Sequence, residues 1–355
     1  ELTLRLRRDH GAGVRIVDAR RPKIGVELEP VAPVAPPEGK AGWSFPGVAM
    51  GLGALLVLAN GFAVGTGSNS ISVLAGGGGG AQFTIDIVGY YTPAVNMDGA
   101  IAAQADGDVF TPLTSPQRAY DSTLTGGPLA SGKSRTIDVT DGGQIPIPAA
   151  ATAVAYTVTE TQTQGTGYLN VSPAGTAPGA TSVINWYAPG QTMANSLIVG
   201  IVDGRITVTA GGGGASDFKI DILGYYSPSA TTPQGQRFTP VTPVRGYDSR
   251  LADGSLGVGA SRATELATGT AIPSRISGLT VNLTETDTVG QGYLRLQAND
   301  GQASTESSTI NWTSSGQTMA SGTMSGVGPN HSVLVTAGGA GGATNYVMDV
   351  TGYFN

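Results

Sequence analysis

Apolar residues alternate with threonine, asparagine or glutamate along two segments of the chain, Ala153 to Thr161 (AVAYTVTET) and Leu279 to Thr286 (LTVNLTET). An alternation of period two is typical of a β-strand with one face buried. Short apolar runs follow each segment, and turn residues separate them about every 8 to 12 positions, the spacing of an antiparallel sandwich or a jelly-roll-like barrel. We therefore expect an all-β fold of tandem antiparallel β-sandwich or jelly-roll-like domains.

One pattern of strands and glycines occurs three times. Its copies are Ala75 to Tyr91 (AGGGGGAQFTIDIVGYY), Ala210 to Tyr226 (AGGGGASDFKIDILGYY) and Ala337 to Phe354 (AGGAGGATNYVMDVTGYF). In each copy one strand enters a glycine run and a second strand leaves it, so we expect a hairpin with the glycines at its tip. The first two copies align without a gap from Leu58 and Met193 onward, 135 residues apart.

The second and third copies match over a longer span. Arg118 to Ser122 (RAYDS) recurs as Arg245 to Ser249 (RGYDS), and the I-N-W sequence of residues 184–186 recurs at 310–312. A repeat this long is typical of separate domains in series rather than of a solenoid. The expected organisation is an atypical N-terminal β unit at 1–93, a linker at 94–108, a β-sandwich module at 109–228, a linker at 229–236 and a second module at 237–355.

The composition is that of a β protein with many tight turns, because 55 of the 355 residues are glycine and only 12% are charged. The absence of cysteine excludes disulfides, zinc–thiolate sites and thiol catalysis. The net charge is −6 and no basic stripe with interleaved aromatics is present, so we expect no nucleic-acid partner. The basic cluster that begins with Arg5, Arg7 and Arg8 is either a docking arm or a solvated strand face.

An uncharged run of 19 residues, Gly47 to Gly65, raises the question of a transmembrane helix. Five glycines interrupt the run, and its second half is in register with the repeat. We therefore expect no membrane span.

Charged residues recur at fixed places in the repeats. Arg118 and Asp121 of the first R-x-Y-D-S motif correspond to Arg245 and Asp248 of the second. Each Asp is expected to accept hydrogen bonds from its own Arg or from the turn that follows, which makes the motif a structural bracket. The acids of the closing strands have two interpretations, a structural bracket or a ligand-binding carboxylate; they are Asp86, Asp221 and Asp349.

Aromatic residues next to amides raise the alternative of a glycan site. Trp186 and Trp312 each precede a short loop and a Gly-Gln-Thr sequence, which supplies Gln191 and Gln317. An exposed indole beside amides can stack on a sugar, whereas a tryptophan in a sandwich core is buried. Tyr120 and Tyr247 of the R-x-Y-D-S motifs are the other candidate platforms for sugar stacking.

No catalytic constellation can be assembled from the sequence. The only histidines, His10 and His331, lie in different units and have no recurring Ser or Asp at triad-like spacing. Glu160 is isolated, so paired carboxylates for glycoside hydrolysis are not available to nominate. We expect a protein that is not an enzyme and that uses no metal and no cofactor.

The two complete modules resemble a known repeat at R-x-Y-D-S, G-Y-L, I-N-W, G-Q-T-x-A and the closing D-x-x-G-Y-Y or D-x-x-G-Y-F. This repeat occurs in exported actinobacterial proteins, often beside cell-wall hydrolases and peptidases. The modules are also similar to parts of minor tail and fibre-type virion proteins from phages of those bacteria. The resemblance implies a non-enzymatic β-rich module presented at a surface, and residues 1–57 depart from it.

Together these observations favour a structural or adhesive virion protein, in which the N-terminal unit docks onto the particle and the two modules project. The expected partners are other virion proteins or further copies of the chain, with host cell-surface polysaccharide as a contact of the modules. The alternative is a secreted actinobacterial protein associated with the cell wall.

Overall fold

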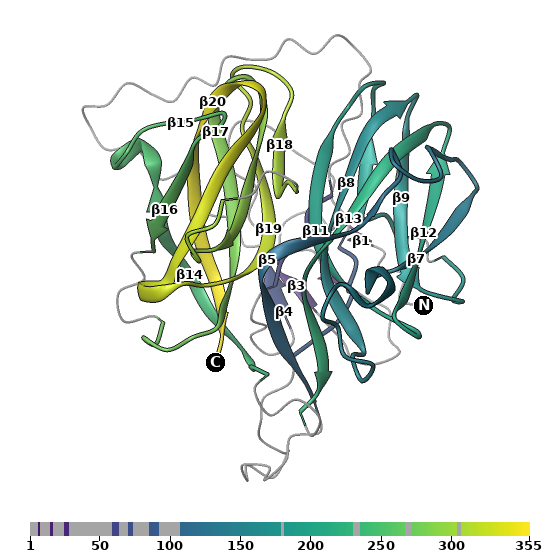
Figure 1. Cartoon of the computed structure of the whole chain (residues 1–355), viewed down its shortest axis with the longest axis horizontal. Coiled ribbons are helices and arrows are strands. Elements are labelled where there is room, and N and C mark those ends of the chain that lie inside the picture. The colour runs from purple at the N-terminus through teal and green to yellow at the C-terminus, as the bar shows by residue number, and fades with distance from the viewer. Residues whose placement is uncertain are drawn as a thin grey trace. The chain divides into compact units, whose positions relative to one another are not determined.

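In the computed structural model, the chain forms two compact units. The first unit comprises Glu1–Leu56 and Val64–Ile87, and the second comprises Val57–Ala63 and Val88–Asn355. Figure 1 shows the chain with its strands labelled. The structure describes residues 6–7, 15–16, 25–27, 59–63, 70–73, 85–91, 107–178, 181–229, 235–266, 272–303 and 307–355. The first 93 residues are thus divided between the two units.

Two short strand pairs are described in the first unit. Strands β1 (Leu6–Arg7) and β2 (Arg15–Ile16) pair antiparallel, whereas β3 (Gly25–Glu27) and β4 (Ser70–Ser72) pair parallel. Strand β4 lies in the part of the first repeat that aligns with Arg205 onward. A strand is therefore kept at this position of the repeat, although its neighbour differs.

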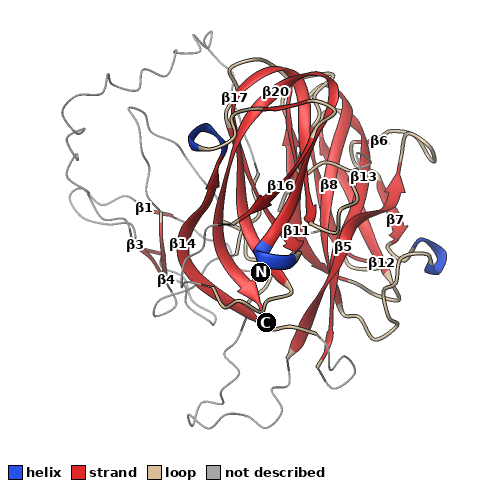
Figure 2. Ribbon diagram, turned by 60° about the vertical axis from the view of Figure 1, so that its left-hand side comes forward, coloured by secondary structure: helices blue, strands red, loops and turns tan. Residues whose placement is uncertain are grey.

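The second unit holds two complete modules, module 1 (109–228) and module 2 (237–355), each built from long antiparallel strands (Figure 2). The strands of module 1 are β5 (Asp108–Asp121), β6 (Leu129–Ala130), β7 (Ser134–Asp138), β8 (Ala153–Gln164), β9 (Gly167–Pro173), β10 (Ile184–Trp186), β11 (Met193–Gly200), β12 (Arg205–Gly212) and β13 (Ala215–Pro228). A 3₁₀ turn, η1 (Asp141–Gly143), lies between β7 and β8.

Eight of these strands form two four-stranded layers with the orders β11-β8-β13-β5 and β10-β9-β12-β7. Chain neighbours such as β8 and β9, or β12 and β13, lie in different layers. An eight-stranded double sheet wound in this way is a jelly roll. The expected all-β, jelly-roll-like fold is confirmed.

Module 2 repeats this winding with fewer, longer strands. They are β14 (Phe238–Asp248), β15 (Leu256–Gly257), β16 (Ser261–Glu265), β17 (Gly278–Ala298), β18 (Ile310–Trp312), β19 (Met319–Gly326) and β20 (Ser332–Phe354), with 3₁₀ turns η2 (Ser249–Leu251) and η3 (Pro329–His331). Strand β17 corresponds to β8 plus β9, and β20 to β12 plus β13. Each passes from one layer to the other through register shifts, for example between Thr286 and Val289.

The glycine run of each module lies at this passage between layers, so the predicted hairpin was wrong. Strands β12 and β13 enter and leave the run but belong to different sheets. The run instead passes close to the neighbouring crossover from β8 to β9, where a Cβ added at Gly214 would lie 1.6 Å from the carbonyl oxygen of Gln164. Two backbones that cross this closely leave no room for side chains.

Three glycines of each module lie beneath aromatic rings. A Cβ at Gly211 would lie 2.2 Å from the ring of Tyr168, its cross-strand partner, and one at Gly167 would lie 2.4 Å from Trp186. The ring covers backbone that glycine leaves bare, which stabilises a glycine within a strand. The remaining pairs are Gly224 with Phe110, Gly292 with Trp312, Gly338 with Tyr293, and Gly352 with Phe238.

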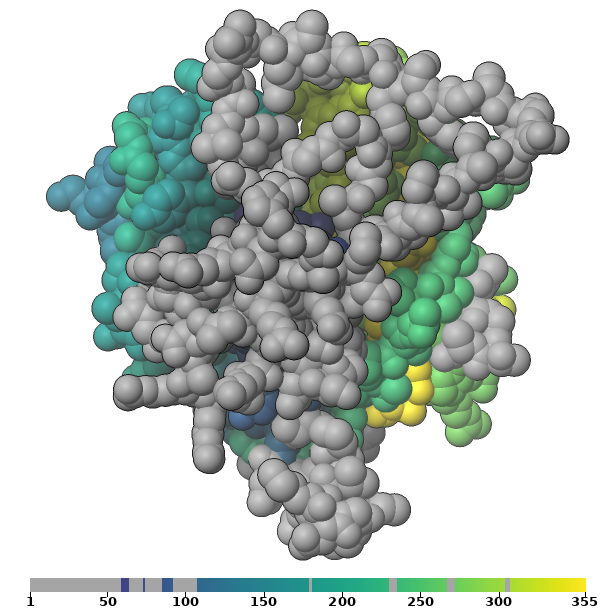
Figure 3. Space-filling view, turned by 180° about the vertical axis from the view of Figure 1, so that it is seen from behind, coloured from purple at the N-terminus to yellow at the C-terminus, as the bar shows by residue number. Residues whose placement is uncertain are grey.

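Each module has its own hydrophobic core between its layers. Along β8 the core side chains are Val154, Tyr156 and Val158, and the same alternation continues to Glu160. The opposite face of β8 is also buried, because Ala155 belongs to a third cluster that includes Phe354 of module 2. Figure 3 views the modules from behind, with module 1 in teal and module 2 in green to yellow.

No helix among the described residues is long and apolar enough to cross a membrane. Most of the 47–65 run lies outside those residues.

Candidate functional site

The R-x-Y-D-S motif of module 1 forms a charged bracket between its first and last strands. Arg118 Nε lies 2.5 Å from Asp221 Oδ1, and Arg118 Nη1 lies 3.1 Å from Asp121 Oδ2. Lys219 Nζ also lies 3.1 Å from Asp121. Burial raises the pKa of Asp221, against the opposing charge of Arg118. The pKa of Asp121 is lowered, because hydrogen bonds from Thr123 and Lys219 outweigh its desolvation.

Module 2 repeats the bracket at more exposed positions. Arg245 Nε lies 2.5 Å from Asp349 Oδ1, and Arg245 Nη1 lies 3.2 Å from Asp248 Oδ2. Arg250 Nη2 lies 2.6 Å from Asp248, and the Arg250 backbone N–H donates to Asp248 Oδ1. The carboxylates therefore join β14, β20 and the following turn, which is the structural interpretation. Asp86, at the corresponding place in the first repeat, is exposed.

The tyrosines of the motif have one face covered. The rings of Tyr120 and Phe218 lie 5.2 Å apart, and those of Tyr247 and Tyr346 lie 5.1 Å apart. The Tyr120 hydroxyl donates to the carbonyl oxygen of Thr125, and Arg135 donates to that hydroxyl at 2.8 Å. Both tyrosines thus pack within their own modules.

The tryptophans lie in the cores and are not available to stack on a sugar. Trp186 and Trp312 are 2% and 1% exposed. Their Nε1 atoms donate to the carbonyl oxygens of Gln164 and Val289. The glycan hypothesis is therefore wrong for these two side chains, because each ring covers a cross-strand glycine.

The two candidate glutamines tie the following loop to the backbone. The Oε1 of Gln191 accepts from the backbone N–H of Tyr187, and that of Gln317 accepts from the N–H of Thr313. Gln191 is 7% exposed.

The side chains of the candidate docking residues lie outside the described part of the chain. Arg5 and Arg8 lie outside the described residues, as do His10 and Trp43. Arg7 belongs to β1, but its side chain is also outside the described part of the chain.

Sequence reasoning missed a junction at which three repeats meet. The backbone N–H of Gly61 donates to Asn195 Oδ1 at 2.9 Å, and the N–H of Gly322 donates to Asn60 Oδ1 at 2.7 Å. Residues 59–61 (ANG), 194–196 (ANS) and 320–322 (ASG) are equivalent in the repeat. The first repeat thus contacts module 1, and module 2 contacts the first repeat, in the same sense. The signal in the sequence was this aligned tripeptide.

Aromatic residues near the ends of the repeats show the same head-to-tail order. The rings of Phe110 and Phe354 lie 4.5 Å apart, and those of Phe238 and Tyr91 lie 4.4 Å apart. In both contacts, a phenylalanine that begins one repeat packs on the final aromatic of another. The hydroxyls of Tyr91 and Tyr226 lie 2.5 Å apart, and desolvation raises the pKa of Tyr91 to about 12.

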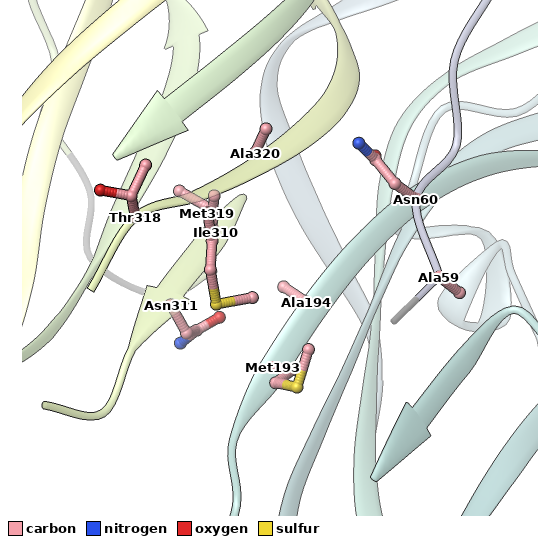
Figure 4. Close-up of a pocket in the computed structure, with 9 residues that line it drawn as sticks. All are labelled: Ala59, Asn60, Met193, Ala194, Ile310, Asn311, Thr318, Met319 and Ala320. Carbon is pink, nitrogen blue, oxygen red and sulfur yellow. The ribbon is translucent and has the colours of Figure 1, made fainter. Parts of the chain in front are cut away.

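A cavity of about 240 Å³ lies at this junction (Figure 4). Three equivalent alanines line it, Ala59, Ala194 and Ala320, together with Met193 and Met319. The wall is mainly apolar and comes from all three repeats.

One buried cation crosses from module 2 to module 1. Arg295 is 1% exposed, and its Nη2 donates to the carbonyl oxygen of Pro116 at 3.3 Å. Its charge also helps to stabilise the ionised form of Asp221. The equivalent residue in module 1 is Asn170. The two modules are therefore not interchangeable at this contact.

Two buried carboxyls were also missed. Glu160 and Glu285 are equivalent, both are 0% exposed, and neither carboxyl has a hydrogen-bond partner among the described residues. Glu160 is paired across the sheet with Met193 on one side and Phe218 on the other. Burial raises the pKa of each glutamate to about 8. The sequence did contain a signal for this burial, because Glu160 continues the alternation of the core residues along β8.

Within the described ranges, no three His, Asp or Glu side chains come together as a metal site. No family model matches the chain, and no curated protein matches it.

Proposed function

We propose that the protein is a non-enzymatic structural and adhesive component of a phage virion. In this proposal the N-terminal unit docks onto the particle and the two jelly rolls project from it.

The main support for this proposal is that the recurring residues pack the modules and join one repeat to the next. The Arg–Asp brackets join strands within each module, and Trp186 and Trp312 fill cores. The equivalent tripeptides and terminal aromatics join one repeat to the next. Residues repeated for packing and for contacts between repeats are what a rigid spacer requires.

The jelly roll is compatible with this role, since capsid and lectin domains are among the proteins that use it.

The test is to find the protein in its native assembly. Antibodies against module 2 are used to label purified particles from the source culture, and the particle proteins are identified by mass spectrometry. Labelling at a fixed place on the particle supports the proposal. Recovery of the protein only from the medium or the bacterial wall contradicts it and favours the secreted alternative.

A host-surface role has its own test. Particles are incubated with isolated host cell walls in the presence of excess soluble protein. Competition for adsorption supports an adhesive role, whereas undiminished adsorption restricts the protein to a structural one.

A further inference from the structure

We propose that the two jelly rolls form an acceptor site for the closing segments of a third repeat, and that a second copy of this chain can supply those segments. The closing segments are residues 59–63 and 88–91. In this structure the chain fills the acceptor with its own closing segments. The inference rests on the geometry of the junction and is independent of the proposed function.

Both modules hold the first closing segment by hydrogen bonds between a backbone N–H and an asparagine side chain. Asn195 of module 1 accepts from the N–H of Gly61, and Asn60 accepts from the N–H of Gly322 in module 2. Each bond uses one side-chain amide oxygen and one backbone donor. The segment therefore makes one bond as donor and one as acceptor, to different modules.

Close backbone contact on both sides shows that the acceptor fits this segment. A Cβ at Gly322 would lie 1.8 Å from the carbonyl oxygen of Gly61, and its next neighbours are also in the segment, at Gly61 and Phe62. A Cβ at Gly61 would lie 2.2 Å from the carbonyl oxygen of Ser196 in module 1. Both contacts require glycine because backbone approaches backbone.

The second closing segment is anchored by its last aromatic. Tyr91 packs on Phe238 of module 2 and shares a hydroxyl–hydroxyl hydrogen bond with Tyr226 of module 1. Tyr91 aligns with Tyr226 and Phe354, so the three repeats bring equivalent residues to one place. The contacts run head to tail, and a head-to-tail contact between equivalent surfaces closes into a ring or continues to another molecule.

Every copy of the chain carries the closing segments that contact the acceptor, so a second copy could supply them. Its own segments are favoured by their high effective concentration, which depends on the stretch that joins Tyr91 to module 1. When those segments are damaged, the acceptor becomes available to the intact segments of a neighbouring copy.

The first experiment asks whether the segments bind without a covalent link. A protease recognition sequence is placed in the 94–106 stretch of the full chain, the folded protein is cleaved, and the products are separated by size-exclusion chromatography at micromolar concentration. The N-terminal piece is expected to remain bound to the C-terminal piece. Separation of the wild-type pieces would overturn the acceptor site.

Two matched substitutions identify the contact. Gly322→Ala is expected to weaken retention of the N-terminal piece roughly ten- to a hundredfold, because the new methyl overlaps Gly61. Gly257→Ala is the control, since its nearest neighbour lies 3.9 Å away. Equal retention by the two variants would show that the pieces are held elsewhere.

The second experiment asks whether another copy can supply the segments. A Gly61→Ala chain has a damaged segment and an intact acceptor, whereas a Gly322→Ala chain has an intact segment and a damaged acceptor. Each variant alone is expected to be monomeric, and an equal mixture is expected to form a one-to-one dimer by light scattering. A mixture that remains monomeric, when the wild-type pieces stay bound after cleavage, would overturn exchange between copies.

Discussion

The backbone N–H of Gly322 donates to Asn60 Oδ1 at 2.7 Å, although 262 positions separate the two residues in the chain. The equivalent asparagine of module 1, Asn195, accepts in the same way from Gly61. These two bonds connect three repeats, and they give the junction its head-to-tail order.

Replacing Asn195 with alanine is expected to destabilise the second unit by about 1–3 kcal/mol. The substitution removes the hydrogen-bond partner of the part-buried Gly61 N–H and the bond that Asn195 Nδ2 donates to the buried carbonyl oxygen of Val183. The measurement is the free energy of unfolding in urea. Ser321→Ala is the matched control at the equivalent position, and it should be near neutral because the buried Ser321 hydroxyl has no hydrogen-bond partner among the described residues. Equal effects of the two substitutions would contradict the role of Asn195.

Stability is expected to fall as the pH rises from about 4.5 to about 8. Glu160 and Glu285 have an ordinary pKa of 4.5, and burial raises the pKa of each to about 8 in the folded protein. Between these values the folded state binds more protons than the unfolded state, so the free energy of unfolding decreases as protons are lost. The slope reaches about 1.4 kcal/mol per pH unit for each carboxyl.

The double variant Glu160→Gln/Glu285→Gln tests this dependence, because an amide occupies the same space without titrating. Its unfolding free energy should fall less steeply than that of the wild type across the same pH range and be higher at pH 8; the remaining slope comes from Asp221, whose pKa is also raised by burial. Parallel curves for the two proteins would refute the assignment. Three acids have a pKa lowered from 3.8, so their protonation changes the unfolding free energy only below the pH range of 4.5 to 8. They are Asp121, Asp138 and Asp248.

The two brackets should differ in strength although their residues match. Asp221→Ala removes a carboxylate whose side chain is 1% exposed and is expected to cost about 1.5–3 kcal/mol, because Arg118 loses a buried charged hydrogen bond and keeps only Asp121 as an acidic partner. Asp349→Ala removes one that is 26% exposed, opposite the half-exposed Arg245, and is expected to cost about 1 kcal/mol or less. Urea unfolding of both variants decides between this order and equal losses.

Tryptophan fluorescence should report the cores and not a ligand. With Trp43→Phe as background, emission from Trp186 and Trp312 is expected to be blue-shifted and poorly quenched by iodide, because both rings are buried. Added cell-wall polysaccharide should leave the spectrum unchanged. A saturable change in emission would show that a sugar reaches these rings.

Much of each module could be predicted from short-range patterns. The alternation around Val154, Tyr156 and Val158 indicates a strand with one face in the core, and the repeated motif pairs Arg118 with Asp121 in the same turn region. The partner Asp221 was found only in the structure, because it lies 103 positions away from Arg118 on the last strand of the module. The prediction of a hairpin at the glycine run was wrong because the local sequence does not specify which sheet the next strand joins.

The sequence by itself determined the all-β class, the strand periodicity and the equivalence of residues between repeats. These depend on side-chain alternation and on spacing along the chain. The tertiary structure alone decided that Trp186 is buried, that the Glu160 carboxyl is buried with no hydrogen-bond partner in the described part of the chain, and that Asn60 reaches Gly322. The physical reason is that burial and contact depend on which surfaces the folded modules bring together. The local sequence around two equivalent residues does not specify whether they face solvent or contact each other.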